Sequence, residues 1–175
     1  MKVTRHSEYL KLASVYLKST ENSFLSEEEV SEHWETLQYL SKPNFKKSLK
    51  EYTAFQTFFR EKNISISFFP INKKTKIDSI YCRDASIATD FGIIICNMGK
   101  QGRIHEPYAQ LEAYKMNNVN ILGEIKFPGT LEGGDVAWLD QNTLAVGHTY
   151  RTNEEGISQL KGLLQPKGIE IIVVE

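Results

Sequence analysis

The chain has 175 residues, of which 41% are hydrophobic and 25% are charged, and its net charge is −1. This length and composition predict one soluble globular domain over residues 1–175, and the near-neutral charge excludes a basic footprint for nucleic acid or an acidic membrane surface. No apolar run reaches the length of a signal peptide at the N-terminus or of a transmembrane helix elsewhere, so we expect no membrane partner.

The two cysteines, Cys82 and Cys96, lie in apolar stretches and lack the spacing of a metal site or a redox pair. We interpret both as reduced thiols on buried strands. Reduced thiols fit a cytoplasmic protein.

The N-terminal part of the chain predicts a strand, two helices and a second strand. The apolar run over residues 12–17 fits a strand or one side of a helix, and we interpret it as a strand. Ser26, followed by three glutamates, is typical of an N-cap and predicts a helix over residues 26–40. A second helix is expected over residues 43–62, with Pro at its start, and alternation predicts a strand over residues 64–69. An apolar stripe on the second helix is assigned to the core: Phe45, Leu49, Tyr52, Phe55 and Phe59.

After Lys76 the pattern changes to short strands separated by turns. Asp90–Gly92 is expected to form a tight turn between two strands, and Met98–Arg103 a glycine-bearing loop before a helix. The expected elements are strands over Ser79–Cys82, Ser86–Thr89 and Gly92–Cys96, a helix over Glu106–Lys115 and a strand over Asn120–Ile125.

The same order of elements then follows a second time. Thr152 and Glu155 have the spacing of a capping box at the start of a helix, and Pro166 and Gly168 end that helix. Its buried stripe is expected to consist of Ile157, Leu160, Leu163 and Leu164. The strands of this second unit are expected over Asp135–Leu139, Thr143–Val146 and Ile169–Val174, with a turn at Asp140–Asn142.

Superposing the two units places Asp84 on Asp135 and Arg103 close to Arg151. The period is roughly fifty residues, within the range of arrayed or propeller-like architectures. Each unit is a ββαβ repeat, and the stretch 12–69 supplies a looser version. Because repeated units bring the same loop to one end of an array, we expect acids and arginines at equivalent positions to converge.

The stretch Thr130–Asp135 places two carboxylates around a glycine pair at the start of an apolar strand. Glycine lets a ligand approach the backbone closely, and the strand beyond holds a carboxylate at a fixed angle. The alternative interpretation is a loop with solvated acids. Taken alone, the hexapeptide fits that alternative better.

The polar residues that should converge suit a zwitterionic, arginine-like ligand. Carboxylates match the planar fork of a guanidinium, and arginines match the carboxylate end of the ligand by the same geometry. A second interpretation is that these groups pair with each other and only hold the repeats together. The acids are Asp78, Asp84, Glu132 and Asp135, and the arginines are Arg103 and Arg151.

Several motifs, in this order, resemble the guanidino-group-modifying enzymes of the pentein superfamily. They are Ile80–Asp84, Thr89–Gly92, Met98–Lys100, Arg103 with Glu106, Leu131–Asp135 and Gly147–Asn153. The similarity is strongest to the branch of the dimethylarginine dimethylaminohydrolases and amidinotransferases. It covers the second half of the chain densely and the first part only through the order of elements. Several spaced motifs in one order are more specific than any single motif.

The resemblance implies a pentein-type α/β propeller of ββαβ repeats, of which this chain would hold about three of five blades. It implies that Glu132 is the catalytic glutamate, which binds the guanidinium and orients a histidine. It implies that Asp84 holds the guanidinium nitrogens and Asp78 other polar atoms of the substrate. Arg103 and Arg151 would bind the substrate carboxylate.

The implied activity is cleavage or transfer at the guanidino group of arginine or a methylated arginine, with no cofactor and no metal. A cysteine thiolate adds to the guanidinium carbon, expels an amine and leaves a covalent amidino intermediate. The family's histidine and cysteine lie beyond the position that matches Glu175, where this sequence stops. We therefore expect an amino-terminal part that is inactive alone and is completed by a second chain or a missing C-terminal half.

Two local departures accompany this resemblance. The arginine pair that the family carries near Arg103 is altered, because Ile104 lies beside it. Cys82 would share a strand face with Asp84 and is a conceivable substitute nucleophile, but the family has an apolar residue there. His6, His33, His105 and His148 match no catalytic position and are interpreted as solvated or locally hydrogen-bonded. A non-catalytic pentein binding or interaction module is the alternative function.

Overall fold

The computed structural model describes residues 7–175 and contains both helices and small sheets. Contacts within the chain divide it into two compact units, residues 11–82 and residues 83–175 together with the segment that ends at Leu10. His6 lies outside the described residues. None of the helices in the described part is both long and apolar enough to cross a membrane.

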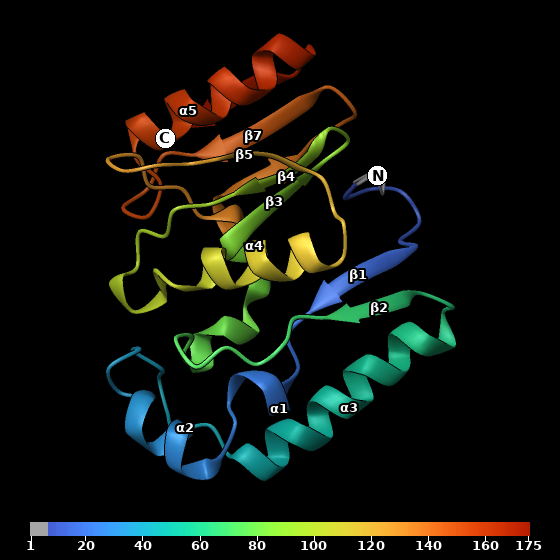
Figure 1. Ribbon diagram of the computed structural model, residues 1–175, viewed down its shortest axis with the longest axis vertical. Helices are drawn as coiled ribbons and strands as arrows, with labels where there is room; N and C mark the ends of the chain where they lie inside the picture. The colour runs from blue at the N-terminus through green and yellow to red at the C-terminus, as the bar shows by residue number, and fades with distance from the viewer. Residues whose placement is uncertain (1–6) are drawn as a thin grey trace. The chain divides into compact units, whose positions relative to one another are not determined.

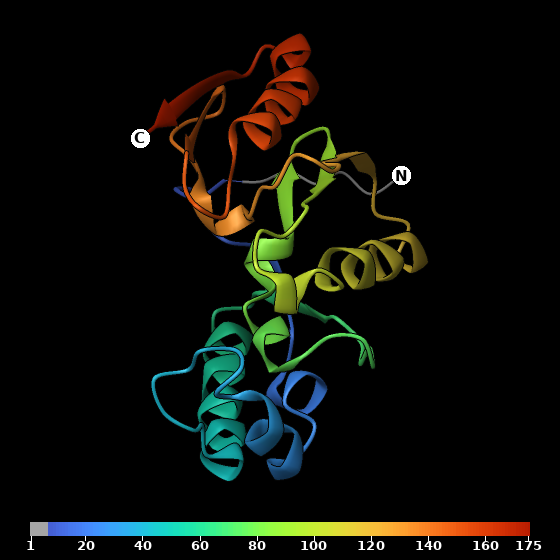
Figure 2. The same ribbon diagram turned by 90° about the vertical axis from the view of Figure 1, so that its left-hand side faces the viewer.

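The unit of residues 11–82 has the predicted order of strand, helices and strand. β1 (Ser14–Leu17) pairs in parallel with β2 (Ser65–Phe68), and α1 (Thr20–Ser23), α2 (Glu27–His33) and α3 (Phe45–Glu61) lie between them in sequence. The three helices gather together, as the blue to cyan ribbons of Figure 2 show. A small apolar core in this unit consists of Phe24, Val30, Leu37 and Ile77, and Phe45 at the start of α3 packs against it.

The helix boundaries differ from the predicted ones. Ser26 caps α2 as expected, by accepting a hydrogen bond from the Glu29 N–H, but α2 ends at His33. Asn44 caps α3, because its side chain accepts the Lys47 N–H, so Pro43 lies before the cap. Assigning the whole α3 stripe to the core was also wrong, since Phe59 is its buried member while Phe55 is 47% exposed.

The predicted strand over Ser79–Cys82 is wrong. Two short 3₁₀ helices, Ile77–Ile80 and Cys82–Ala85, occupy this part of the chain. The Ser79 N–H bonds to the carbonyl of Lys76 and the Tyr81 N–H to that of Asp78, so local turns satisfy backbone groups that a strand would pair across a ladder. Cys82 and Asp84 therefore do not alternate along a strand, and Cys82 is half-buried rather than a buried strand residue.

In the unit of residues 83–175, the first ββαβ repeat is confirmed. β3 (Ser86–Thr89) pairs antiparallel with β4 (Gly92–Ile95), and β4 pairs in parallel with β5 (Ile121–Glu124) after α4 (Glu106–Met116). The tight turn before β4 depends on Gly92, whose φ is +136°, a conformation that other residues rarely adopt.

The second repeat has the same topology. β6 (Val136–Trp138) pairs antiparallel with β7 (Thr143–Gly147), and β7 pairs in parallel with β8 (Glu170–Val174) after α5 (Glu154–Leu164). The predicted capping box is wrong, because Asn153 caps α5 by accepting the Gly156 N–H. The hydroxyl of Thr152 instead bonds to Asp135.

One apolar core joins the two repeats of this unit. Leu131 precedes β6, Leu144 and Val146 lie on β7, and Leu160 lies on α5; all four are fully buried in the same cluster as Ile94 of β4. Figure 1 shows α5 lying along β7. Because the core holds the strands rigidly, the loops at the strand ends start from fixed positions. None of the small sheets closes on itself in the described part of the chain.

Candidate functional site

Glu132 lies directly before the glycine pair, and its side chain is 7% exposed. Its Oε1 accepts a hydrogen bond from the backbone N–H of Lys100 at 3.0 Å. Arg151 Nη1 lies 3.2 Å from both Oε1 and Oε2 of the same carboxylate. Burial of a carboxylate costs free energy unless hydrogen bonds and an opposite charge offset it, and here a backbone amide and a guanidinium do so.

Asp84 belongs to a second ion-pair group. Arg103 donates from Nη1 to Asp84 Oδ2 and, through Nε and Nη2, forms a fork with the two oxygens of Glu106 at 2.9 and 2.7 Å. The side chains of Arg103 and Glu106 are 5% and 3% exposed, and that of Asp84 is 22% exposed. Burial by itself lowers the pKa of Arg103, but the paired carboxylates outweigh burial and raise this pKa overall. Arg103 therefore keeps its charge.

The glycine pair brings Glu132 and Asp84 into the same neighbourhood. A Cβ placed on Gly134 would lie 2.5 Å from Asp84 Oδ1, and one on Gly133 would lie 2.4 Å from the carbonyl oxygen of Arg83. A side chain at Gly133 would displace the backbone that leads to Asp84, and one at Gly134 would displace the Asp84 carboxylate. The convergence predicted from the repeats thus occurs for these two acids, and the absence of side chains on the glycines permits it.

Cys96 lies at the end of β4 and is buried near both acids. Burial raises the pKa of its thiol strongly, and the charges of Asp84 and Glu132 add to the rise. A thiol kept neutral in this way is a poor nucleophile. Cys96 is therefore part of the packing beneath the two acids.

Asp135, on the far side of the glycine pair, does not contact an arginine in the way its repeat partner Asp84 does. Its Oδ2 accepts hydrogen bonds from the hydroxyls of Thr149 and Thr152. Sequence analysis assigned no site role to either threonine. The sequence feature that could have indicated a site role is their position on both sides of Arg151, in the loop that follows β7.

Asp78 lies in the unit of residues 11–82. It is 3% exposed and belongs to the 3₁₀ helix Ile77–Ile80. Burial raises the pKa of the neighbouring Tyr39 far above its usual range, and the charge of Asp78 and the phenol group of Tyr81 add to this rise. The Tyr39 and Tyr81 rings lie 6.4 Å apart. Asp78 is thus a buried acid beside two tyrosines.

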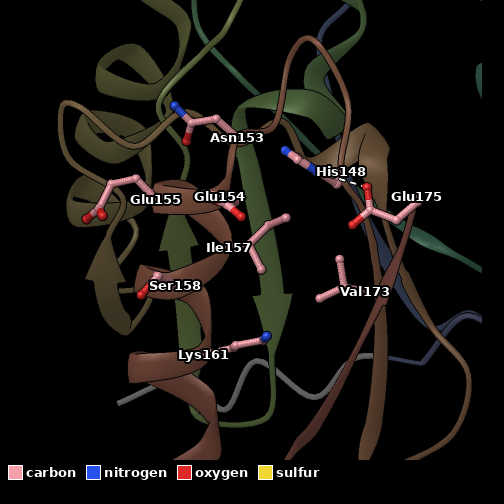
Figure 3. Close-up of a pocket in the computed structure, with 9 residues that line it drawn as sticks. All are labelled: His148, Asn153, Glu154, Glu155, Ile157, Ser158, Lys161, Val173 and Glu175. Atoms are coloured by element: carbon pink, nitrogen blue, oxygen red, sulfur yellow. Dashed lines mark hydrogen bonds and ion pairs between the residues drawn. The ribbon is translucent and has the colours of Figure 1, made fainter.

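A groove of about 790 Å³ lies elsewhere, between α5 and the end of β8 (Figure 3). Its residues include His148, whose Nδ1 lies 3.1 Å from an oxygen of Glu175. Glu132 and Asp84 do not line it.

The prediction that His148 is locally hydrogen-bonded is confirmed, as is that for His33, which contacts Glu29 and Lys76. Among the described residues, no group of three histidine, cysteine or acidic side chains is arranged to hold a metal ion.

Comparison with known proteins places these features in a family. The profile described as "N,N dimethylarginine dimethylhydrolase, eukaryotic" matches residues 21–175. The chain belongs to this family. It is 27% identical over 139 residues to the N(G),N(G)-dimethylarginine dimethylaminohydrolase of Pseudomonas aeruginosa, an alignment that covers 79% of this chain and 54% of the relative. The chain therefore spans about half the length of this relative.

Solved structures of the superfamily share the fold. The dimethylarginine dimethylaminohydrolase of Pseudomonas aeruginosa in complex with citrulline superposes with a TM-score of 0.74 at 22% identity, over 94% of this chain and 61% of that chain. An amidinotransferase from Microseira wollei superposes with a TM-score of 0.72 at 15% identity, over 99% of this chain and 62% of that chain. The predicted membership of the dimethylargininase and amidinotransferase branch of the penteins is confirmed.

Proposed function

We propose that this chain supplies the substrate-binding half of an enzyme that cleaves or transfers the amidino group of arginine or a methylated arginine. The observation that carries the proposal is the pair of acids, Glu132 and Asp84, held beside one glycine pair with two arginines within reach. Family membership supports the same substrate class, because the curated relatives are named for dimethylarginine and one solved relative holds citrulline.

In this proposal the substrate guanidinium binds between Glu132 and Asp84. Two fixed carboxylates localise the positive charge of the guanidinium and make its central carbon a better electrophile. Glu132 would also orient the acid/base histidine, and Asp78 would bind further polar atoms of the substrate. Arg103 and Arg151 would bind the substrate carboxylate.

Substrate binding then requires an exchange of partners, because both arginines are already paired. Arg151 would leave Glu132 when the substrate guanidinium arrives and would turn to the substrate carboxylate. Arg103 would have to release Asp84 or Glu106, and its side chain is only 5% exposed. The side chain of Arg151 is 23% exposed, so it is more accessible to the substrate carboxylate than that of Arg103.

Neither Cys82 nor Cys96 would be the nucleophilic thiolate, and none of the histidines of this chain would be the acid/base histidine. Cys96 is buried with a raised pKa, and Cys82 is half-buried with its sulfur 3.7 Å from the carbonyl oxygen of Tyr16. We propose that the chain forms about three blades of a five-bladed propeller and that a second polypeptide or further sequence completes the site. That second polypeptide or further sequence would also decide whether the amidino intermediate is hydrolysed or its amidino group is transferred to an amine.

Binding of ligands to the purified chain tests the proposal directly. Thermal unfolding should shift upward with L-arginine, asymmetric dimethylarginine and citrulline, because a ligand that binds only the native state raises Tm. Glu132→Gln should reduce the shift and leave the Tm of the free chain nearly unchanged, since glutamine keeps the shape of the side chain. Wild-type curves indifferent to all three ligands would reject the proposed function.

A non-catalytic binding module is the second candidate, favoured by the internal pairing of Arg103 with two acids. The interpretation that these pairs only hold the repeats together predicts that arginine-like ligands leave Tm unchanged. Citrulline formation separates the candidates further. Turnover by the chain alone that is abolished in Cys82→Ser would assign the nucleophile to Cys82, against our expectation.

A further inference from the structure

The loop that carries Arg151 is held by a side chain outside the proposed ligand contacts. Asp135 Oδ2 accepts hydrogen bonds from Thr149 Oγ1 at 2.9 Å and from Thr152 Oγ1 at 2.6 Å. Asp135 is half-buried and Thr152 is fully buried, so water competes poorly for these bonds. One carboxylate oxygen thus fixes the direction of two hydroxyl protons.

The two hydroxyls pass this orientation to the backbone. A hydroxyl has a single proton, and once that proton points to Asp135 its lone pairs remain as acceptors. Thr152 Oγ1 accepts the N–H of Glu132 at 3.1 Å. Thr149 Oγ1 accepts the N–H groups of Arg151 at 3.0 Å and of Thr152 at 3.1 Å. Asp135 therefore controls hydrogen bonds to the backbones of both Glu132 and Arg151.

These two backbones carry the two sides of one ion pair, in which Arg151 Nη1 contacts both oxygens of Glu132. A functional site tolerates errors of only about 0.5 Å in such groups, so their supporting hydrogen bonds decide whether the groups meet. The strand β6 that begins after Asp135 is rigid, and it gives the carboxylate a fixed origin.

We propose that Asp135 is a positioning residue of this site. Through Thr149 and Thr152 it sets the distance between the guanidinium-binding acid Glu132 and the carboxylate-binding Arg151, and hence the length of ligand that the site accepts. The ligand part of this inference rests on the proposed function. The positioning itself is a property of the free chain and is measured without ligand.

Amide hydrogen exchange of the full chain, followed by NMR, tests the positioning. In Asp135→Ala, the amides of Glu132 and Arg151 should exchange about tenfold faster or more, while amides in the middle of β7 keep their rates. Asp135→Asn retains an acceptor oxygen and should restore most of the protection. A role confined to overall stability would instead accelerate β7 and the two site amides equally.

Asp140→Ala is the matched control. Asp140 also accepts a bond from a threonine hydroxyl, that of Thr143 at 3.0 Å, but it is exposed in the turn between β6 and β7. Its removal should leave the amides of Glu132 and Arg151 unchanged. Unchanged protection of these amides in folded Asp135→Ala as well would overturn the proposal.

Threonine variants keep the proposal testable if Asp135→Ala does not fold. Valine preserves the shape of threonine without the hydroxyl. Thr152→Val should accelerate exchange at Glu132, and Thr149→Val should accelerate exchange at Arg151. Equal effects of the two variants on both amides would contradict the assigned hydrogen bonds.

The ligand experiment compares guanidinium, which binds the acids Glu132 and Asp84 but not Arg151, with L-arginine, which binds the acids and also Arg151. Thr149→Val should weaken arginine binding severalfold more than guanidinium binding, whereas Thr152→Val should weaken both. Equal losses for both ligands in Thr149→Val would overturn the role in ligand length. Wild-type chain that binds neither ligand would reject the proposed function, and the exchange rates would still decide the positioning role.

Discussion

Arg151 Nη1 lies 3.2 Å from each carboxylate oxygen of Glu132, so the chain places one of its own guanidinium groups where the proposed substrate guanidinium would bind. The Tyr150 ring supports this position, since the Arg151 guanidinium carbon lies 5.0 Å from the ring centroid. Substrate and Arg151 would therefore compete for Glu132. This competition has consequences that differ between ligands.

Arg151→Gln should change the affinities for guanidinium and for arginine in opposite directions. Free guanidinium should bind more tightly because its competitor at Glu132 is gone, while L-arginine should bind more weakly because its carboxylate loses a partner. A hydrogen bond to a charged group contributes about 1.5–3 kcal/mol, which corresponds to roughly tenfold or more in each affinity. Isothermal titration of both ligands measures this, and parallel changes would exclude the competition.

Arg103→Met should strongly destabilise the unit of residues 83–175. The variant leaves the carboxylate of Glu106 buried without its cation, and breaking a buried pair costs about 3–5 kcal/mol. The double variant Arg103→Met with Glu106→Met should recover much of this loss, because no buried charge remains at position 106. Unfolding by urea is the suitable measurement, since guanidinium would also bind the proposed site. A double variant less stable than Arg103→Met would contradict this account.

Gly134→Ala should weaken ligand binding through Asp84. The new Cβ would lie 2.5 Å from Asp84 Oδ1, so the carboxylate must shift, at a cost of about 1–3 kcal/mol in stability. Gly162→Ala is the control, because no atom lies within 4 Å of a Cβ there and alanine favours the helix by about 0.5–1 kcal/mol. Thermal unfolding with and without arginine should show a reduced ligand shift only for Gly134→Ala.

Cys96 should make the stability of the chain fall at alkaline pH. Burial, with Asp84 and Glu132 nearby, raises the pKa of the folded thiol above the value of 9.0 expected for an exposed thiol. Below about pH 9 the thiol is neutral in both states, and above it only the unfolded thiol ionises, so the contribution of Cys96 falls by about 1.4 kcal/mol per pH unit.

Urea unfolding of wild type and Cys96→Ala at pH 8, 9 and 10 isolates this contribution, because ionisation of the tyrosines affects both proteins alike. The stability advantage of wild type over Cys96→Ala should shrink above pH 9. A constant difference across this range would show that the thiol does not stay neutral in the folded chain.

Local sequence determined most of the regular structure. The strands and helices of the two ββαβ repeats were predicted from alternation, apolar stripes and turn residues, because each of these features depends on neighbours within a few positions. The order of motifs was also sufficient to identify the family, which the match over residues 21–175 confirms.

Tertiary structure decided where the polar side chains found their partners. Thr152 has the spacing of a capping box, yet its hydroxyl bonds to Asp135 and Asn153 caps the helix instead. The segment Ser79–Cys82 was predicted as a strand, yet local turn bonds satisfy its backbone. Arg151 and Glu132 are nineteen positions apart, and spacing alone could not decide whether they pair with each other or bind a ligand. A hydrogen bond goes to whichever partner the folded chain brings within about 3 Å, and that choice is made by the packing of the whole unit.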